Sequence, residues 1–149
     1  MTIRYDDQVA IVTGSGNGLG RSHALALASR GAKVVVNDLG GSVTGDGASS
    51  AAALETVAMI EAAGGEAIAN SANVARMDQV EAMVAQAVEK WGRVDILVNN
   101  AGILRDKSFV KMGIDDFQLV VDVHLMGSAN CSKAVWQLMR EQGYGRIVM

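Results

Sequence analysis

Short runs rich in valine and isoleucine alternate along this chain with longer stretches whose apolar residues recur at helical spacing. The short runs cover residues 9–13, 33–38, 66–71, 95–100 and 146–149. Continuous apolar strands joined by helices are typical of a parallel sheet with helices on both faces, because right-handed crossovers place the helices there. The sequence therefore predicts an α/β fold with a doubly wound parallel sheet, in the order β-α-β-α-β-α-β-α-β, that ends in its fifth strand.

Glycines mark the ends of the predicted helices. Gly31 follows the first helix, and the glycines at 64–65 close a helix that starts near Ala48. The last long helix is predicted to run roughly from Asp115 to Glu141, ending before Gly143 and Gly145.

The length of 149 residues, half of them hydrophobic, fits one domain that covers residues 1–149. The sequence stops at Met149, inside the fifth predicted strand. A natural domain seldom ends within a buried strand, so we expect this domain to be incomplete at its C-terminus.

The charge pattern excludes two classes of partner. The formal net charge is −3, and the 13 basic and 16 acidic residues are scattered, so no basic surface for nucleic acid or an anionic membrane is predicted. No apolar run approaches the roughly 20 residues of a membrane span. We therefore expect a small-molecule substrate, or another copy of the chain, as the partner.

The cysteine and histidine content bounds the chemistry further. A single cysteine, Cys131, cannot form a disulfide within the chain, which favours the cytoplasm or another reducing compartment. Its apolar neighbours predict a buried side chain rather than a nucleophile. The two histidines, His23 and His124, lie far apart and show no metal-ligand spacing, so no metal site is predicted.

The stretch TGSGNGLG, residues 13–20, lies between the first predicted strand and the first predicted helix. In a Rossmann-like sheet this turn is the usual phosphate site. Gly14 permits the tight turn, Gly16 and Gly18 let the backbone approach a pyrophosphate, and Gly20 lets the helix pack close to the strand. The N-terminus of the helix adds unpaired N–H groups and a partial positive charge.

An acidic residue at the end of the second strand reinforces this prediction. Asp38 follows the glycine loop at about the spacing at which a carboxylate meets the ribose hydroxyls of NAD. Its negative charge repels the 2′-phosphate of NADP, and Leu39 supplies no basic side chain. We predict NAD rather than NADP; the alternative for Asp38 is a solvated turn residue.

These residues together resemble a known family. The glycine pattern from Thr13 to Gly20, with Asp38 and the motif NNAG at 99–102, resembles the short-chain dehydrogenase/reductase superfamily over essentially the whole chain. The runs NDLGG (37–41), NNAGILRDKSF (99–109) and VHLMGS (123–128) look like the (3R)-hydroxyacyl-CoA dehydrogenase domain of multifunctional β-oxidation enzymes. The chain would then be the N-terminal, cofactor-binding half of such a domain.

The resemblance implies roles for individual residues around NAD. Gly14, Ser15, Asn17, Gly18, Leu19 and Gly20 would surround the phosphates; Asp38 and Leu39 would flank the adenosine ribose; Asn73 and Val74 would meet the adenine; Asn99, Ala101 and Gly102 would run beside the riboses. Asn99 would also tie neighbouring strands together.

The chain departs from the family pattern at two places. His124 stands where the family commonly has an asparagine in its proton relay, and an imidazole could relay a proton there. A structural histidine that bonds a backbone carbonyl is the alternative. The catalytic Ser and Tyr-x-x-x-Lys of the family lie beyond the fifth strand, where this chain has no residue.

The resemblance implies an NAD-dependent oxidoreductase that moves a hydride between a secondary alcohol, such as a 3-hydroxyacyl-CoA, and NAD. A non-catalytic dinucleotide-binding module or sensor is the alternative. The predicted helix 115–141 is apolar on more than one face, which favours a homo-oligomer, a dimer or a tetramer. Its apolar residues include Val120, Val121, Met126, Trp136, Leu138 and Met139.

Overall fold

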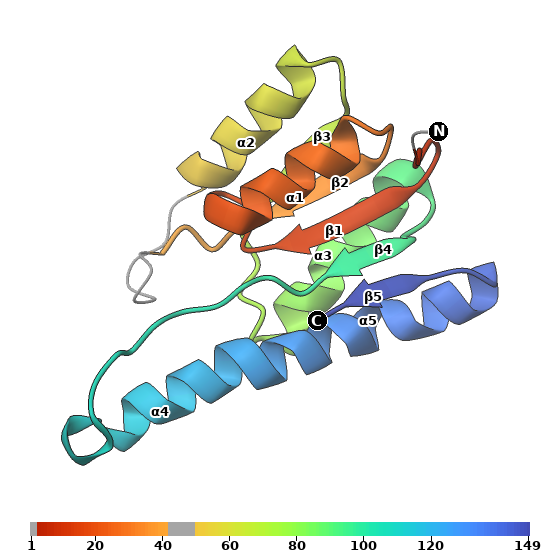
Figure 1. The fold of residues 1–149 in the computed structure, drawn as a ribbon. Helices are drawn as coiled ribbons and strands as arrows, with labels where there is room; N and C mark the ends of the chain where they lie inside the picture. The colour runs from red at the N-terminus through yellow and green to blue at the C-terminus, as the bar shows by residue number, and fades with distance from the viewer. Residues whose placement is uncertain (1–2, 42–49) are drawn as a thin grey trace.

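Five parallel strands form the centre of the computed structural model, which describes residues 3–41 and 50–149 (Figure 1). The strands are β1 (Val9–Thr13), β2 (Lys33–Asn37), β3 (Ala67–Asn70), β4 (Ile96–Val98) and β5 (Arg146–Val148). They lie side by side in the order β3-β2-β1-β4-β5, and each neighbouring pair is parallel. The predicted Rossmann-like sheet is confirmed, with the fifth strand at its edge.

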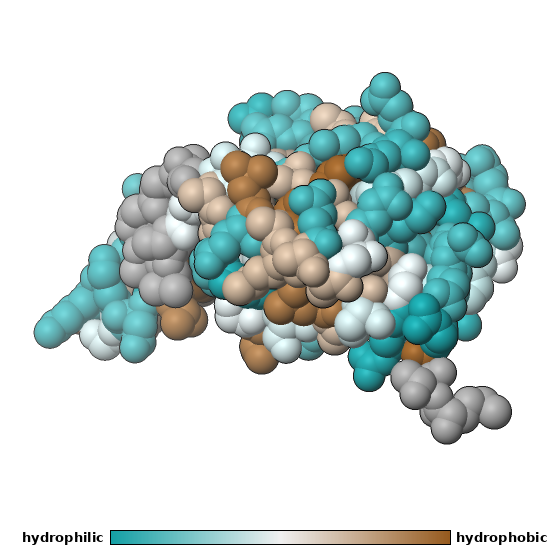
Figure 2. Space-filling view, turned by 90° about the horizontal axis from the view of Figure 1, so that it is seen from above, coloured by the Kyte–Doolittle hydropathy of each residue, from teal (hydrophilic) through white to brown (hydrophobic). Residues whose placement is uncertain are grey.

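Helices cover both faces of this sheet, as its apolar strands require. Helices α1 (Gly18–Ala28) and α2 (Ala51–Ala62) lie on one face, and α3 (Met77–Trp91) and α5 (Gly127–Gln142) lie on the other (Figure 1). Figure 2, seen from above, shows apolar residues near the middle of the face, with hydrophilic residues around them. None of the helices in the described part of the chain is long and apolar enough to span a membrane.

Alternate side chains of the strands enter two separate cores, because successive residues of a strand point to opposite faces. Ala10 and Val12 of β1 pack toward α1 and α2, whereas Val9 and Ile11 pack toward α3 and α5. All four side chains are fully buried. The central strand is therefore apolar on both faces, which is why its sequence reads as an unbroken hydrophobic run.

The long helix predicted at about 115–141 is present, and a π-helical segment lies inside it. The structure has α4 (Ile114–Val121), then a π-helical segment at Asp122–Met126, and then α5. Helix α4 extends away from the sheet, and a short 3-10 turn at Phe109–Lys111 precedes it (Figure 1). A π-helical turn keeps the helical backbone but changes which residues share a face, so the spacing of apolar residues does not reveal it.

The remaining differences lie at element boundaries. The predicted strand 95–100 is shortened to Ile96–Val98, and from Asn100 onward the chain bonds to the glycine loop. Helix α2 begins at Ala51 in the described chain. The predicted helix start at Ala48 lies outside the described residues.

Candidate functional site

The site lies where the connections of the sheet change direction. From β1 the chain adds β2 and β3 on one side, and β4 and β5 then lie on the other side of β1. The carboxyl ends of β1, β2 and β4 therefore meet at a crevice, which is where parallel α/β sheets bind ligands. A cavity of about 170 Å³ opens there.

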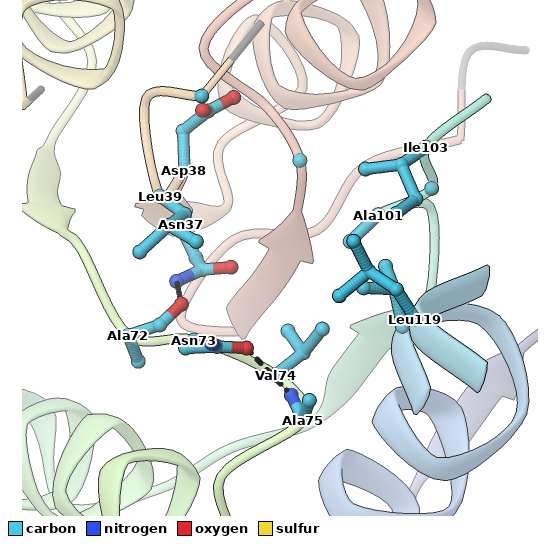
Figure 3. Close-up of a pocket in the computed structure, with 14 residues that line it drawn as sticks. Asn37, Asp38, Leu39, Ala72, Asn73, Val74, Ala75, Ala101, Ile103 and Leu119 are labelled. Carbon is cyan, nitrogen blue, oxygen red and sulfur yellow. Dashed lines mark hydrogen bonds between the residues drawn. The ribbon is translucent and has the colours of Figure 1, made fainter. Parts of the chain in front are cut away.

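Segments far apart in the sequence line this cavity. Figure 3 shows Asp38 and Leu39 on one side and Ile103 and Leu119 on the opposite side, with the turn after β3 between them. Seven of the residues predicted for the cofactor line it: Gly14, Asp38, Leu39, Asn73, Val74, Ala101 and Gly102. The structure adds Asn37, Gly41, Ala72, Ala75, Ile103, Leu119 and Val123.

Two glycines of the loop permit close backbone packing. Gly14 has a φ of +62°, and a Cβ there would lie 2.8 Å from the Cα of Ala101. A Cβ on Gly20 would overlap the carbonyl oxygen of Gly14. Because any larger residue would separate these segments, both glycines hold the start of α1 close to β1 and to the segment after β4.

The N-terminus of α1 leaves donors available for an anion. Helix α1 begins at Gly18, and no side chain caps this end of the helix. The first N–H groups of a helix have no acceptor within it, and the helix dipole makes this end partly positive. Asn17, Gly18 and Leu19 are exposed at this end, outside the lining of the cavity.

The side chain of Ser15 faces inward rather than toward the cavity. Its hydroxyl is fully buried and donates to the carbonyl oxygen of Val12 at 2.7 Å. Its backbone N–H donates to the carbonyl oxygen of Asn37 at 2.8 Å. Ser15 therefore joins the ends of β1 and β2 and shapes the loop from beneath.

Backbone groups orient the carboxylate of Asp38. Its Oδ2 accepts the N–H of Gly16 at 2.8 Å, and its Oδ1 accepts the N–H of Gly40 at 2.7 Å. Two carboxylate oxygens offer about four acceptor positions. Within the described part of the chain, the half-buried side chain therefore keeps about two of them for a ligand.

Asparagines fix the turn that forms the middle of the cavity wall. The amide of Asn37 donates to the carbonyl oxygen of Ala72 and to Oδ1 of Asn70, both at 3.0 Å. The Oδ1 of Asn73 accepts the N–H of Ala75 at 2.9 Å (Figure 3). These bonds satisfy the polar backbone of the turn after β3 and set the position of Val74 in the lining.

A second network, which the sequence analysis missed, joins the glycine loop to the segment after β4. The Nδ2 of Asn100 donates to the carbonyl oxygens of Thr13 and Gly14, at 2.9 and 3.0 Å. In return, the Oγ1 of Thr13 accepts the N–H groups of Asn100 and Ala101, both at 3.0 Å. The paired asparagines of the NNAG motif were the available signal, but only the first was assigned a role.

Asn99 lies at the junction of β4, β5 and α5. Its N–H donates to the carbonyl oxygen of Val148 at 2.9 Å, which extends the pairing of the two strands. Its Nδ2 donates to the hydroxyl of Ser132 at 3.3 Å. Its Oδ1 is buried without a hydrogen-bond partner in the described structure, and the side chain does not line the cavity.

His124 lies in the π-helical segment, beside the chain that follows the NNAG motif. Its Nε2 is 3.0 Å from the carbonyl oxygen and 3.1 Å from the backbone nitrogen of Ile103. A Cβ on Gly102 would lie 2.7 Å from Cε1 of this ring, so glycine permits the contact. The ring is exposed and flanks the cavity without lining it.

Comparisons with known proteins agree with this geometry. The family model for short chain dehydrogenases matches residues 8–149. Peroxisomal multifunctional enzyme type 2 of Drosophila melanogaster is 56% identical over 147 residues, which are 99% of this chain and 24% of the relative. Peroxisomal hydratase-dehydrogenase-epimerase of Saccharomyces cerevisiae is 51% identical over 98% of this chain and 16% of the relative.

Solved structures show the same fold. A short chain dehydrogenase from Mycobacterium avium superposes with a TM-score of 0.84 at 46% identity, over 95% of this chain and 53% of that chain. A 7α-hydroxysteroid dehydrogenase in complex with NADH and 7-oxo glycochenodeoxycholic acid gives a TM-score of 0.86 at 34% identity, over 97% of this chain and 52% of that chain. The chain thus spans about half the length of these two proteins and a smaller part of the two peroxisomal relatives. It belongs to the short-chain dehydrogenase family.

Proposed function

We propose that residues 1–149 form the NAD-binding part of a dehydrogenase that moves a hydride between a secondary alcohol and NAD. The cofactor, when bound, supplies the nicotinamide ring that exchanges the hydride. The 3-hydroxyacyl-CoA thioesters are the proposed substrate class, because relatives over nearly the whole chain are named as peroxisomal multifunctional and hydratase-dehydrogenase-epimerase enzymes.

The geometry of Asp38 is the observation that carries the choice of NAD. Each of its oxygens accepts one backbone N–H, so the described residues leave about two acceptor positions free. Two adjacent hydroxyls, such as the 2′-OH and 3′-OH of an adenosine ribose, match this capacity. A 2′-phosphate offers no such donors and is repelled by the carboxylate, while Leu39 beside it adds no positive charge.

The other predicted residues fit the remaining parts of the dinucleotide. The N-terminus of α1, with Gly18 at its start, would hold the diphosphate. Val74, whose side chain is buried in the cavity wall, would pack against the adenine. Ala101 and Gly102, on the opposite side, would leave room for the nicotinamide ribose.

His124 is proposed to help move the alcohol proton. Its Nε2 lies at hydrogen-bond distance from both backbone groups of Ile103, so either ring tautomer finds a partner there. Its exposure leaves the ring open to water. The same contacts also fit the alternative, in which His124 is a structural residue. If His124 relays a proton, the variant His124→Asn should change the pH dependence of turnover in the full-length protein.

A homo-oligomer is proposed from the surface of α4, α5 and the segment between them. Phe117, Leu125, Met126 and Trp136 are between 45% and 64% exposed. Large apolar side chains grouped on connected helices favour association. Sedimentation of the full-length protein should show a dimer or a tetramer, and a strict monomer would contradict this.

The proposed location is the cytoplasm, where the free thiol of Cys131 would stay reduced. Relatives of this chain carry peroxisomal names, so the peroxisome is the competing location. Microscopy of the tagged full-length protein, with a peroxisomal marker, distinguishes the two.

The central test uses the full-length natural polypeptide that contains this sequence. Fluorescence titration should give NADH a Kd at least about tenfold lower than that of NADPH. The two enantiomers of a 3-hydroxyacyl-CoA should then be mixed with NAD in separate reactions, and the (3R) enantiomer should produce NADH absorbance. Tight NADH binding without turnover of any secondary alcohol would instead support a non-catalytic dinucleotide-binding module.

A further inference from the structure

We propose that Thr56 and Arg21 are positioning residues of the NAD site, which they serve by fixing the Gly16 carbonyl without lining the cavity. This inference rests on the proposed function, because it concerns the affinity and the selectivity of that site. Thr56 lies in α2 and Arg21 lies in α1, so two helices meet at one backbone group.

The contacts form a closed triangle of hydrogen bonds. The Nε of Arg21 donates to the carbonyl oxygen of Gly16 at 2.8 Å, and the hydroxyl of Thr56 lies 3.1 Å from the same oxygen. The Nε of Arg21 also lies 3.0 Å from the Oγ1 of Thr56. Glu55, bonded to Nη2 of Arg21 at 2.8 Å, steadies the far end of the guanidinium.

Burial separates this arrangement from an ordinary surface contact. Thr56 is completely buried, and the side chain of Arg21 is 19% exposed. A threonine inside a helix commonly bonds the carbonyl four residues earlier, and Thr56 has that contact with Ala52 at 3.2 Å. The hydroxyl has one proton, so the carbonyl oxygen of Gly16, at 3.1 Å and outside the helix, shares this donor with Ala52.

Gly16 is a residue of the loop whose backbone needs restraint from other groups. A Cβ there would lie 2.6 Å from Oδ2 of Asp38 and 2.8 Å from the Cβ of Ala52, so only glycine fits. Glycine also has the widest backbone freedom of any residue. Gly16 therefore cannot be replaced by a residue with a stiffer backbone, and neighbouring side chains must fix its conformation instead.

The two sides of Gly16 are held by different groups. Its N–H donates to Asp38, while its carbonyl oxygen is held by Thr56 and Arg21. If the carbonyl is released, the N–H loses its fixed direction and Asp38 loses one of its two backbone donors. A carboxylate that is no longer oriented must be ordered by the nucleotide itself, which weakens binding.

The test replaces each donor in the full-length protein and measures nucleotide affinity by fluorescence. Thr56→Val keeps the shape and removes the hydroxyl, and Arg21→Met keeps the length and removes the donor. Each variant should raise the Kd for NADH about tenfold, and each should reduce the preference for NADH over NADPH. ADP-ribose, which carries the adenosine end without the nicotinamide, should lose affinity in parallel.

Two controls separate positioning from stability. Thr56→Ser restores the hydroxyl and should keep the Kd within about twofold of the wild type. Ser29→Ala removes a hydroxyl that bonds Ala26 on the exposed side of α1 and should leave the Kd unchanged. Thermal unfolding of every variant shows how much of each change is loss of fold.

Three outcomes overturn the inference, and they are distinguishable. If Thr56→Val lowers the melting temperature while NADH affinity and preference stay unchanged, Thr56 is only a core residue. If Thr56→Val does not fold, Arg21→Met decides, and an unchanged Kd rejects the positioning role. If the wild type binds neither NADH nor NADPH, the proposed function fails first and takes this inference with it.

Discussion

The two ends of the sheet each hold an aspartate, and the two carboxylates are partnered very differently. At the amino end, Asp95 precedes β4, is completely buried and accepts three hydrogen bonds. Their donors are the N–H of Val9, at 2.9 Å, and two nitrogens of Arg93, at 2.8 and 2.7 Å. At the carboxyl end, Asp38 is half-buried and accepts one backbone N–H on each oxygen.

The difference shows how the same side chain serves the fold at one end and a ligand at the other. The Asp95 carboxylate is paired with a cation, and it raises the pKa of the Arg93 guanidinium by hydrogen bonding and charge attraction. It has almost no acceptor capacity left for another molecule. Asp38 is oriented just as firmly, but it faces a cavity and has no cationic partner among the contacts of the described chain.

Removing the buried carboxylate of Asp95 should have the largest effect on stability. Asp95→Ala leaves the buried N–H of Val9 without its acceptor and removes two hydrogen bonds from Arg93, whose guanidinium is 43% exposed and can be hydrated, so the expected cost is about 2 kcal/mol. Urea unfolding of the full-length protein measures the loss. NADH affinity of the folded fraction should stay unchanged, and a loss below about 1 kcal/mol would contradict the assigned role.

Removing the carboxylate of Asp38, at the other end of the sheet, should change NADH affinity much more than stability. Asp38→Ala removes the ribose acceptor and the repulsion of a 2′-phosphate, so the Kd for NADH should rise by about tenfold or more, and NADPH should gain relative to NADH. The free energy of unfolding should change little, because the side chain is half-buried. Asp78→Ala, an exposed aspartate of α3, is the matched control. An unchanged preference for NADH would reject the role of Asp38.

Smaller changes in both the unfolding free energy and the NADH affinity are expected from the network between the glycine loop and the segment after β4. Asn100→Ala leaves the carbonyl oxygens of Thr13 and Gly14 without their side-chain donor. The expected cost is about 1 to 2 kcal/mol of unfolding free energy, together with weaker NADH binding. Asn100→Asp should be worse, because its carboxylate would face the same two oxygens. Equal behaviour of the two variants would show that the amide is not needed there.

The sequence predicts the strands well because the sheet is buried on both faces. The strand Val9–Thr13 is buried at every position and apolar at all but its last, and few other structures require such a run. The glycine loop and Asp38 are predictable for a similar reason, since their spacing reflects one backbone path between two neighbouring strands.

The remaining features depend on contacts between distant segments. Thr56 contacts Gly16 from forty positions away, and Asn100 reaches Thr13 from eighty-seven positions away. Each reads locally as an ordinary helix or loop residue, so no pattern marks it. The π-helical turn at Asp122–Met126 is not predictable for a different reason: the apolar spacing of a helix tolerates one extra residue in a turn.

The thiol of Cys131 is a third acidic group to compare with Asp95 and Asp38. Its pKa is shifted by burial, and within the described chain the sulfur lacks the hydrogen-bond donors that hold the two carboxylates. Burial raises the pKa of this thiol from 9.0 to about 12. The folded protein therefore keeps the thiol neutral above the pKa of the unfolded chain, and stability is lost as the pH rises from about 9 toward 12. At about pH 10 the wild type should have lost about 1 kcal/mol that a Cys131→Ala variant does not lose.

The measurement is urea unfolding of both proteins at several pH values between neutrality and about pH 10. Other groups that titrate in this range act equally on both proteins, so the difference between the two curves isolates Cys131. If the unfolding free energies of the two proteins change with pH in parallel, the thiol ionises as easily in the folded protein as in the unfolded one. That result would contradict the prediction, because the buried core beneath α5 would have to hold an unpaired charge. Reaction with a thiol reagent only after unfolding is the second expected result, because the folded protein buries the sulfur and keeps it protonated.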